Sequence, residues 1–180
     1  MKEELENETT EGKIFYHISS CAYVQGDVVS IDTFNGVTHY HQNLSREDKE
    51  IDNYLSENRS TYAPSRSHCI YAFVKMEYCV YFRNKELRNG ETFHLYKCKM
   101  DVSKGHPMIL VGKIKSASEQ DREKLKEEYW NPTRKWMLLE YLSDTIEILE
   151  EIPITPELIT RSTMIGQCDY SEDYDRANHI

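Results

Sequence analysis

The sequence predicts a single α+β domain, and three observations support this class. Short segments rich in aromatic and β-branched residues lie near both ends of the chain, as is typical of strands. Few helical patterns separate them, which favours an α+β or β-sandwich-like architecture over a doubly wound α/β fold. The length of 180 residues, without internal repeats or a low-complexity linker, suits one core.

The first half of this domain combines three expected strands with two expected helices. Residues 13–19 are apolar and aromatic and predict a strand, and Gly26 and Asp27 mark a turn before a second extended segment at 28–32. From Ser45, an N-cap candidate, acidic residues and then Ile51, Tyr54 and Leu55 follow at helical spacing. The remaining expectations are a central strand at 67–74 and a helix at 76–82.

The second half continues the mixture of strands and helices. Residues 92–100 alternate in polarity and predict a strand, whereas the apolar run 108–112 is ambiguous between helix and strand. A helix is expected from Ser116 or Ser118 up to the stop at Asn131-Pro132. Residues 136–142 lead to a last strand at 145–154, whose Ile146 and Ile148 should face the core.

Both ends of the chain are polar. We expect residues 1–12 to form a disordered leader, residues 13–165 the single domain, and residues 166–180 a polar tail that is frayed. The leader is acidic and lacks the apolar centre of a signal peptide, and no apolar run approaches the ~20 residues that span a bilayer. These features predict a cytoplasmic protein, of the bacterial or host cell, without membrane partners.

Composition narrows the classes of partner and cofactor. The formal charge of −9 and the pI near 5.3 remove the general attraction to nucleic acids and anionic membranes. The five cysteines include no close pair of the kind that zinc and redox motifs use, and Cys69, Cys79 and Cys98 stand among apolar neighbours. We therefore predict buried reduced thiols, no disulfide and no metal.

Common catalytic signatures are absent from the sequence, which has no P-loop, GxGxxG, GxSxG or HExxH motif. Two histidines, His39 and His41, are spaced like metal ligands, but no third ligand is evident and a solvated loop at 36–44 is the better interpretation. Classical nucleotide folds and common hydrolases are therefore not indicated.

A scattered set of polar residues remains as candidates for chemistry. On its own, His17 is most simply a half-buried histidine bonded to a backbone carbonyl, and Ser65-Arg66 could merely turn the chain after Pro64. Glu140 is different, because its neighbours in Leu-Leu-Glu-Tyr-Leu belong in a core, and a carboxylate there needs a partner or a function.

These residues also occur in a recognisable order. Tyr-His-Ile-Ser at 16–19, a glycine at 26, the run R-x-x-Y-x-P-S-R-x-x-x-I-Y-A-F at 59–73, Glu-Glu-Tyr-Trp at 127–130 and Leu-Leu-Glu-Tyr-Leu at 138–142 follow one another. This order resembles an uncharacterised bacterial and phage family that is distantly related to ADP-ribosyltransferase toxins. The resemblance covers about residues 14–152, and residues 59–73 are its most specific part.

The resemblance implies an ADP-ribosyltransferase-like fold, in which two packed mixed or antiparallel β-sheets with flanking helices hold NAD in the cleft between them. His17 on the first strand would bind NAD, and Tyr71 would stack on the nicotinamide, whereas Tyr16 would pack into the sheet. Arg66 would neutralise the pyrophosphate, which suits a guanidinium. Ser19 and Ser65 complete the implied NAD-binding residues.

The implied catalytic residue is Glu140. Cleavage of the nicotinamide N-glycosidic bond builds positive charge on the ribose, and an adjacent carboxylate stabilises that charge in the transition state. Position 138 is Leu, so the polar residue that arginine-directed transferases place two residues before this glutamate is absent, and transfer to arginine is disfavoured.

Two functions that use the cleft stay open at the level of sequence, beside a third hypothesis of an acidic interaction protein with no nucleotide site. The first is an NAD-dependent ADP-ribosyltransferase, toxin-like, that uses NAD as substrate and modifies a macromolecule, a protein rather than a nucleic acid. The alternative is a catalytically inactive nucleotide- or protein-binding module of the same fold, such as a phage antidefence or inhibitor protein. In both cases we expect His17, Arg66 and Glu140 to converge within the length of one ligand.

Overall fold

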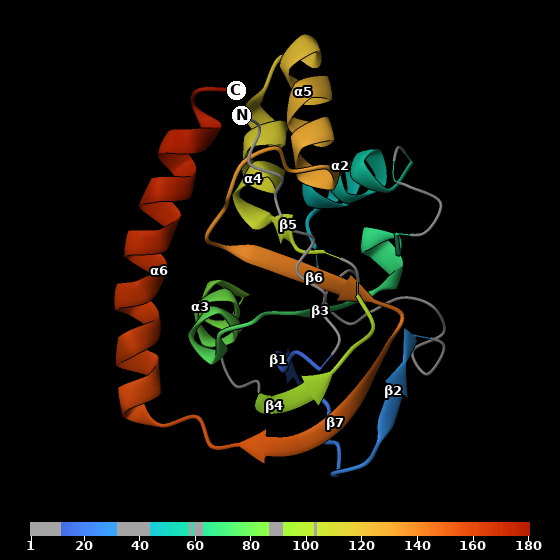
Figure 1. Ribbon diagram of the computed structural model, residues 1–180, viewed down its shortest axis with the longest axis vertical. Helices are drawn as coiled ribbons and strands as arrows, with labels where there is room; N and C mark the ends of the chain where they lie inside the picture. Colours follow the sequence, from blue (N-terminus) through green and yellow to red (C-terminus); the bar gives the residue numbers. More distant parts are fainter. Residues whose placement is uncertain (1–11, 32–43, 58, 60–62, 87–91, 103) are drawn as a thin grey trace.

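The computed structural model describes residues 12–31, 44–57, 59, 63–86, 92–102 and 104–180, except for the side chains at 84–86 and 165–171. Nearly all of the expected leader, and His39 and His41 of the expected loop, lie outside these residues. The architecture is α+β, as the sequence predicts, with strands gathered in two sheets and helices around them (Figure 1).

The larger sheet has four antiparallel strands in the order β1-β4-β7-β2. Their bounds are Phe15–Ser19 (β1), His94–Lys99 (β4), Thr145–Ile152 (β7) and Val28–Ser30 (β2). The turn before β2 needs Gly26, whose φ of +90° is open to glycine at little cost. The expected strands at both ends of the chain are thus confirmed, and they meet in one sheet.

The smaller sheet has three antiparallel strands in the order β3-β6-β5. Their bounds are Ile70–Ala72 (β3), Leu139–Ser143 (β6) and His106–Pro107 (β5). One antiparallel bridge joins the sheets, because Tyr16 and Phe73 exchange two backbone hydrogen bonds of 2.7 and 2.9 Å. Strands β1, β3 and β6 carry four of the expected site residues, His17, Ser19, Tyr71 and Glu140, and β3 lies between the other two.

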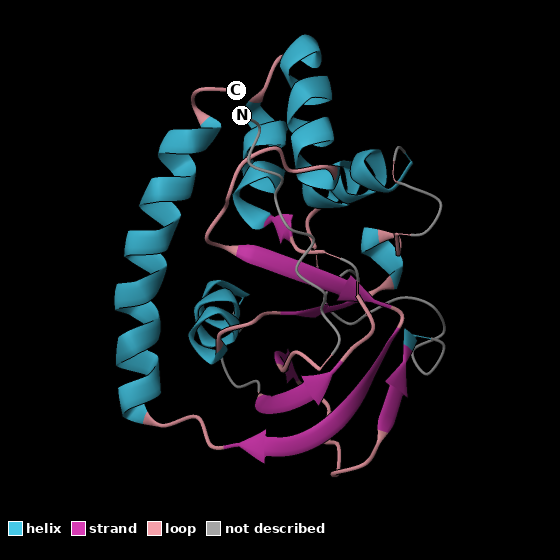
Figure 2. Cartoon of the chain, in the orientation of Figure 1, coloured by secondary structure: helices cyan, strands magenta, loops and turns pink. Residues whose placement is uncertain are grey.

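The helices cover the sheets from several sides (Figure 2). Their bounds are Arg46–Glu57 (α2), Met76–Glu86 (α3), Met108–Ser116 (α4), Glu119–Trp130 (α5) and Pro156–Ala177 (α6), with a short 3-10 helix, η2, at Arg66–His68. Figure 1 shows α2, α4 and α5 on the side of β6 away from the larger sheet, and α6 alongside α3.

Two apolar clusters fix which way each strand faces. Phe15, Ile70, Ala72, Tyr141 and Ile148 belong to a cluster that draws on both sheets. A second cluster joins β3 and β6 to the helices α2, α4 and α5, and its members from these strands are Tyr71 and Leu142. Since side chains alternate along a strand, Tyr71, Leu142 and Glu140 share the face of the smaller sheet that the helices cover.

Several segments differ from their sequence-based expectations. Residues 136–142, expected to lead to the last strand, contain the first four residues of β6, and the strand expected at 67–74 is limited to β3 because η2 occupies its start. The ambiguous run at 108–112 is the start of helix α4, although it contains Gly112. The expected frayed tail is wrong for its described part, because α6 continues to Ala177. Asp173 in this helix is fully buried, and its carboxylate accepts hydrogen bonds from the backbone N–H groups of Met137 and Leu138 at 2.9 and 2.7 Å.

Helix ends and thiols follow the sequence more closely. Ser118 caps α5 by accepting a hydrogen bond from the Asp121 N–H, and Asn131 ends the helix. Cys69, Cys79 and Cys98 are buried free thiols. None of the helices described combines the length and the apolar character that crossing a lipid bilayer requires.

Candidate functional site

A buried ionic cluster forms around the guanidinium of Arg66. Its Nε donates to Asp52 Oδ1 at 2.7 Å, and its Nη1 contacts both Glu140 Oε1 and the hydroxyl of Tyr129. The Tyr129 hydroxyl donates to the same Glu140 oxygen at 2.8 Å. Arg66 is 2% exposed and Glu140 1%, so this cluster is closed to solvent.

The burial of Glu140 follows from its strand position. Leu139 and Tyr141 face the cluster between the sheets, so Glu140 must face the helix layer, where α5 brings Tyr129 and α2 brings Asp52. Burial raises the pKa of Glu140, and its contacts with Arg66 and Tyr129 oppose that rise only in part. Two carboxyl groups thus contact one buried guanidinium, and the nearby Asp52 carboxylate adds to the rise in the pKa of Glu140.

His17 lies on β1 and reaches toward the same part of the smaller sheet. Its Nδ1 is 2.8 Å from the backbone oxygen of Tyr71, the arrangement that the simplest interpretation of this histidine predicts. Burial lowers the pKa of His17, which favours the neutral ring. The Tyr71 side chain is buried on the helix side, and its hydroxyl donates to the backbone oxygen of Arg66 at 2.6 Å.

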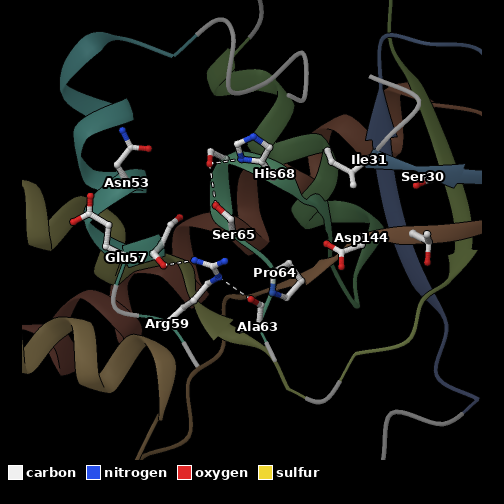
Figure 3. A pocket seen from close by; sticks show the side chains of 13 residues that line it. Ser30, Ile31, Asn53, Glu57, Arg59, Ala63, Pro64, Ser65, His68 and Asp144 are labelled. Carbon is white, nitrogen blue, oxygen red and sulfur yellow. Dashed lines mark hydrogen bonds between the residues drawn. The ribbon is translucent and has the colours of Figure 1, made fainter. Parts of the chain in front are cut away.

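A pocket of about 830 Å³ opens next to the ionic cluster, at the end of the smaller sheet. The larger sheet contributes Ser30 of β2 and Thr145 of β7 to its wall, and Asp144, between β6 and β7, lies beside them. Helix α2 and the residues after it supply another wall, with Glu57 and Arg59 (Figure 3). The pocket is therefore bounded by one end of the larger sheet, by helix α2 and by the segment 63–68 that leads into β3.

The floor of this pocket is a chain of hydrogen-bonded side chains around η2. Ser65 Oγ lies 2.9 Å from Ser67 Oγ, which lies 2.7 Å from His68 Nδ1. Pro64 and Ala63 continue the wall below Ser65, and Arg59 donates to the Ala63 carbonyl at 2.9 Å (Figure 3). Hydroxyl, imidazole and guanidinium groups of this kind can bind the hydroxyls and phosphates of a polar ligand.

The structure brings some of the expected site residues together and separates others. Arg66 and Glu140 are in contact. Tyr71 is hydrogen-bonded through its hydroxyl to the Arg66 carbonyl, and His17 is hydrogen-bonded to the Tyr71 carbonyl. Of the expected site residues only Ser65 lines the pocket. The residues that line it do not include His17, Ser19, Arg66, Tyr71 or Glu140. Ser19 lies at the end of β1, where its Oγ accepts from the Cys21 N–H at 3.0 Å.

Three residues of this region were not candidates from the sequence. Asp52 carried a usable signal, since a carboxylate three residues before Leu55 and one after Ile51 lies on the apolar face of its helix. Tyr129 in Glu-Glu-Tyr-Trp gave no sign of its partner. His68 stands only three residues after Ser65, but nothing in the sequence indicates that the two share a pocket floor.

Neither the protein-family models nor the curated proteins match this chain. Among the residues that the structure describes, no group of three or more His, Cys, Asp or Glu side chains is arranged to hold a metal ion. The function therefore has to be argued from the geometry of the pocket and the ionic cluster.

Proposed function

We propose that this chain is a nucleotide-binding module that takes a nicotinamide–adenine dinucleotide in the pocket between helix α2, the segment 63–68 and the larger sheet. The observation that carries the proposal is the pocket itself, because it contains Ser65, which the resemblance assigns to NAD binding, beside the polar side chains of Ser67, His68 and Arg59. Its volume of about 830 Å³ falls within the range of roughly 300–1,000 Å³ of small-molecule sites.

The state of Glu140 favours binding over catalysis. A catalytic carboxylate must reach the nicotinamide ribose, but Glu140 is 1% exposed and its Oε1 is taken by Arg66 and Tyr129. Burial also raises the pKa of Glu140, which disfavours the carboxylate form that would stabilise a cationic transition state. These facts support the inactive-module hypothesis over the ADP-ribosyltransferase hypothesis.

One observation keeps the transferase as a second candidate. His17, Tyr71 and Glu140 lie on the neighbouring strands β1, β3 and β6, and His17 is bonded to Tyr71. The resemblance assigns these three residues, together with Ser19, Ser65 and Arg66, to NAD binding and catalysis. A ligand that displaced Arg66 from Glu140 would free the carboxylate for this role.

Thermal unfolding with NAD tests the proposal. At ten times its Kd, a ligand that binds only the folded state adds about 1.4 kcal/mol, which raises the Tm of a chain this size by roughly 3–6 °C. We expect this shift for the unmodified chain and a smaller one for His68→Ala, an exposed residue of the pocket floor. His94→Ala on β4, which is not a pocket residue, is the matched control.

Release of nicotinamide separates the two candidates. The binding module should shift its Tm with NAD and release no nicotinamide. Release that falls by about two or more orders of magnitude in Glu140→Gln would establish the transferase instead. If no nicotinamide or adenine nucleotide changes the Tm, both are wrong.

A further inference from the structure

Arg66 occupies an unusual position with respect to the pocket. The residues on either side of it in the chain, Ser65 and Ser67, line the pocket, while its own side chain runs in the opposite direction into the ionic cluster. The short helix η2 is thus polar on both sides. One side lines the pocket, and the other carries the ion-paired Arg66 side chain, which is 2% exposed.

The inward side of this turn is tied to three separate elements. The guanidinium contacts Asp52 of α2, Tyr129 of α5 and Glu140 of β6. It also lies 5.3 Å from the ring centroids of both Tyr71 and Tyr129, so aromatic rings confine it as well. A planar fork with several donors can satisfy such a set, whereas a lysine ammonium cannot.

The backbone of the turn is held by the same elements. The Arg66 N–H donates to Ser56 Oγ at 3.1 Å, and the Arg66 carbonyl accepts from the Tyr71 hydroxyl at 2.6 Å. Ser56 in turn donates to the Asp52 carbonyl at 2.6 Å. Both peptide groups of Arg66 and its side chain are therefore fixed by helix α2 and the smaller sheet.

The outward side of the turn is held mainly by hydrogen bonds among its own residues. Ser65, Ser67 and His68 are linked to one another by side-chain hydrogen bonds, and the His68 N–H donates to the Ser65 carbonyl at 2.9 Å. His68 is exposed. The positions of these three side chains depend on the backbone of the turn, and Arg66 fixes that backbone.

We infer that Arg66, with Glu140, is a positioning residue of the pocket: the buried ion pair sets the backbone that presents Ser65, Ser67 and His68 to a ligand. It does not touch the ligand itself. The inference concerns the floor of the pocket in the free chain, and it rests on the proposed function only for the effect on NAD affinity. It reassigns the Arg of the Pro-Ser-Arg motif from pyrophosphate binding to support of its neighbours.

The test compares Arg66→Lys with Arg46→Lys, a change at a 94%-exposed arginine of α2. The readout is the ¹⁵N–¹H spectrum of the histidine rings at a temperature where each variant is folded. In Arg66→Lys the His68 signals should move toward those of Ser67→Ala, which lacks the hydroxyl bonded to His68. Where the chain binds NAD, its Kd should also rise about tenfold, the effect of losing one or two hydrogen bonds. Arg46→Lys should change neither.

An ion pair that only stabilises the fold would behave differently. It would lower the Tm of Arg66→Lys but leave the His68 signals of the folded protein unchanged, and that result overturns the inference. If Arg66→Lys does not fold, Tyr71→Phe decides, because it removes only the hydroxyl bonded to the Arg66 carbonyl. Shifted His68 signals in a chain that does not bind NAD would refute the proposed function and leave the positioning role in place.

Discussion

At the scale of single residues, the balance of charge around Arg66 determines how stable the buried ionic cluster is. One guanidinium contacts two carboxyl groups, Asp52 and Glu140, which are 3% and 1% exposed. Charges removed from water are costly unless they are paired and hydrogen-bonded, and the excess carboxylate makes this arrangement sensitive to the charge on Glu140. Glu140→Gln, which keeps the shape of the side chain, should therefore destabilise the protein less than the truncation Glu140→Ala.

Substitution of Glu140 tests this balance. Glu140→Ala removes the acceptor of both Arg66 and Tyr129 and should lower the free energy of unfolding by about 3 kcal/mol. Glu140→Gln keeps an acceptor oxygen and should cost roughly 1 kcal/mol or less. Urea denaturation of the two variants at one pH measures both values. Equal losses for the two variants would show that the charge and its partners are not what Glu140 contributes.

The sequence indicates half of this arrangement. An acid inside Leu-Leu-Glu-Tyr-Leu has to find a partner, and Arg66 was placed in the same expected site, so their meeting agrees with the expected convergence. The direction of the Glu140 side chain was not predictable in this way. It depends on which face of β6 the helices cover, and that is settled by packing between residues more than 60 positions apart.

At the scale of elements, the contact between β5 and β6 requires Gly105. A Cβ atom at this position would lie 2.8 Å from Tyr141 Cζ and 2.9 Å from Leu139 Cβ, which is closer than packed carbon atoms approach. The chain before β5 therefore passes directly over the strand that carries Glu140. Gly112 in α4 is the opposite case, because a Cβ there would meet nothing within 4 Å.

These two glycines make a matched pair of predictions. Gly105→Ala should lower the free energy of unfolding by about 1–3 kcal/mol, since Tyr141 and Leu139 must move. Gly112→Ala should raise it by roughly 0.5–1 kcal/mol, since alanine favours the helix and costs no space. Thermal or urea unfolding of both variants gives the comparison. A Gly105→Ala chain as stable as the unmodified one would mean that β5 does not lie so close to β6.

The elements also show where sequence patterns succeed. Strands β1, β4 and β7 and helices α2 and α5 follow from alternation, helical spacing and caps, which are local signals. Helix α6 does not, because what stabilises its polar end is non-local. Asp173 binds the backbone before β6, 35 residues away, and the 22-residue helix lies against α3.

At the scale of the whole molecule, two sheets and a layer of helices enclose histidines as well as apolar groups. His106 is 4% exposed, stacks on Tyr129 with ring centroids 5.1 Å apart, and its Nδ1 is 3.1 Å from the Tyr129 carbonyl. Burial lowers the pKa of His106 to about 4, and it also lowers the pKa of His17. The folded state holds these rings neutral, so the stability of the entire chain depends on pH.

The direction of this dependence follows from proton uptake. The unfolded chain binds a proton at His106 below its ordinary pKa of 6.5, while the folded chain binds it only near 4, so protons favour unfolding between these values. The contribution of His106 to the free energy of unfolding is fully present above pH 6.5, and it falls by about 3 kcal/mol as the pH drops to 4. Other groups titrate in the same range. The informative quantity is therefore the difference in free energy of unfolding between the unmodified chain and His106→Phe, which keeps the ring packing. Measured by urea denaturation, the free energy of unfolding of the unmodified chain minus that of His106→Phe should fall as the pH drops from 6.5 to 4. A difference that stays constant over this range would show that His106 is not held neutral by the fold.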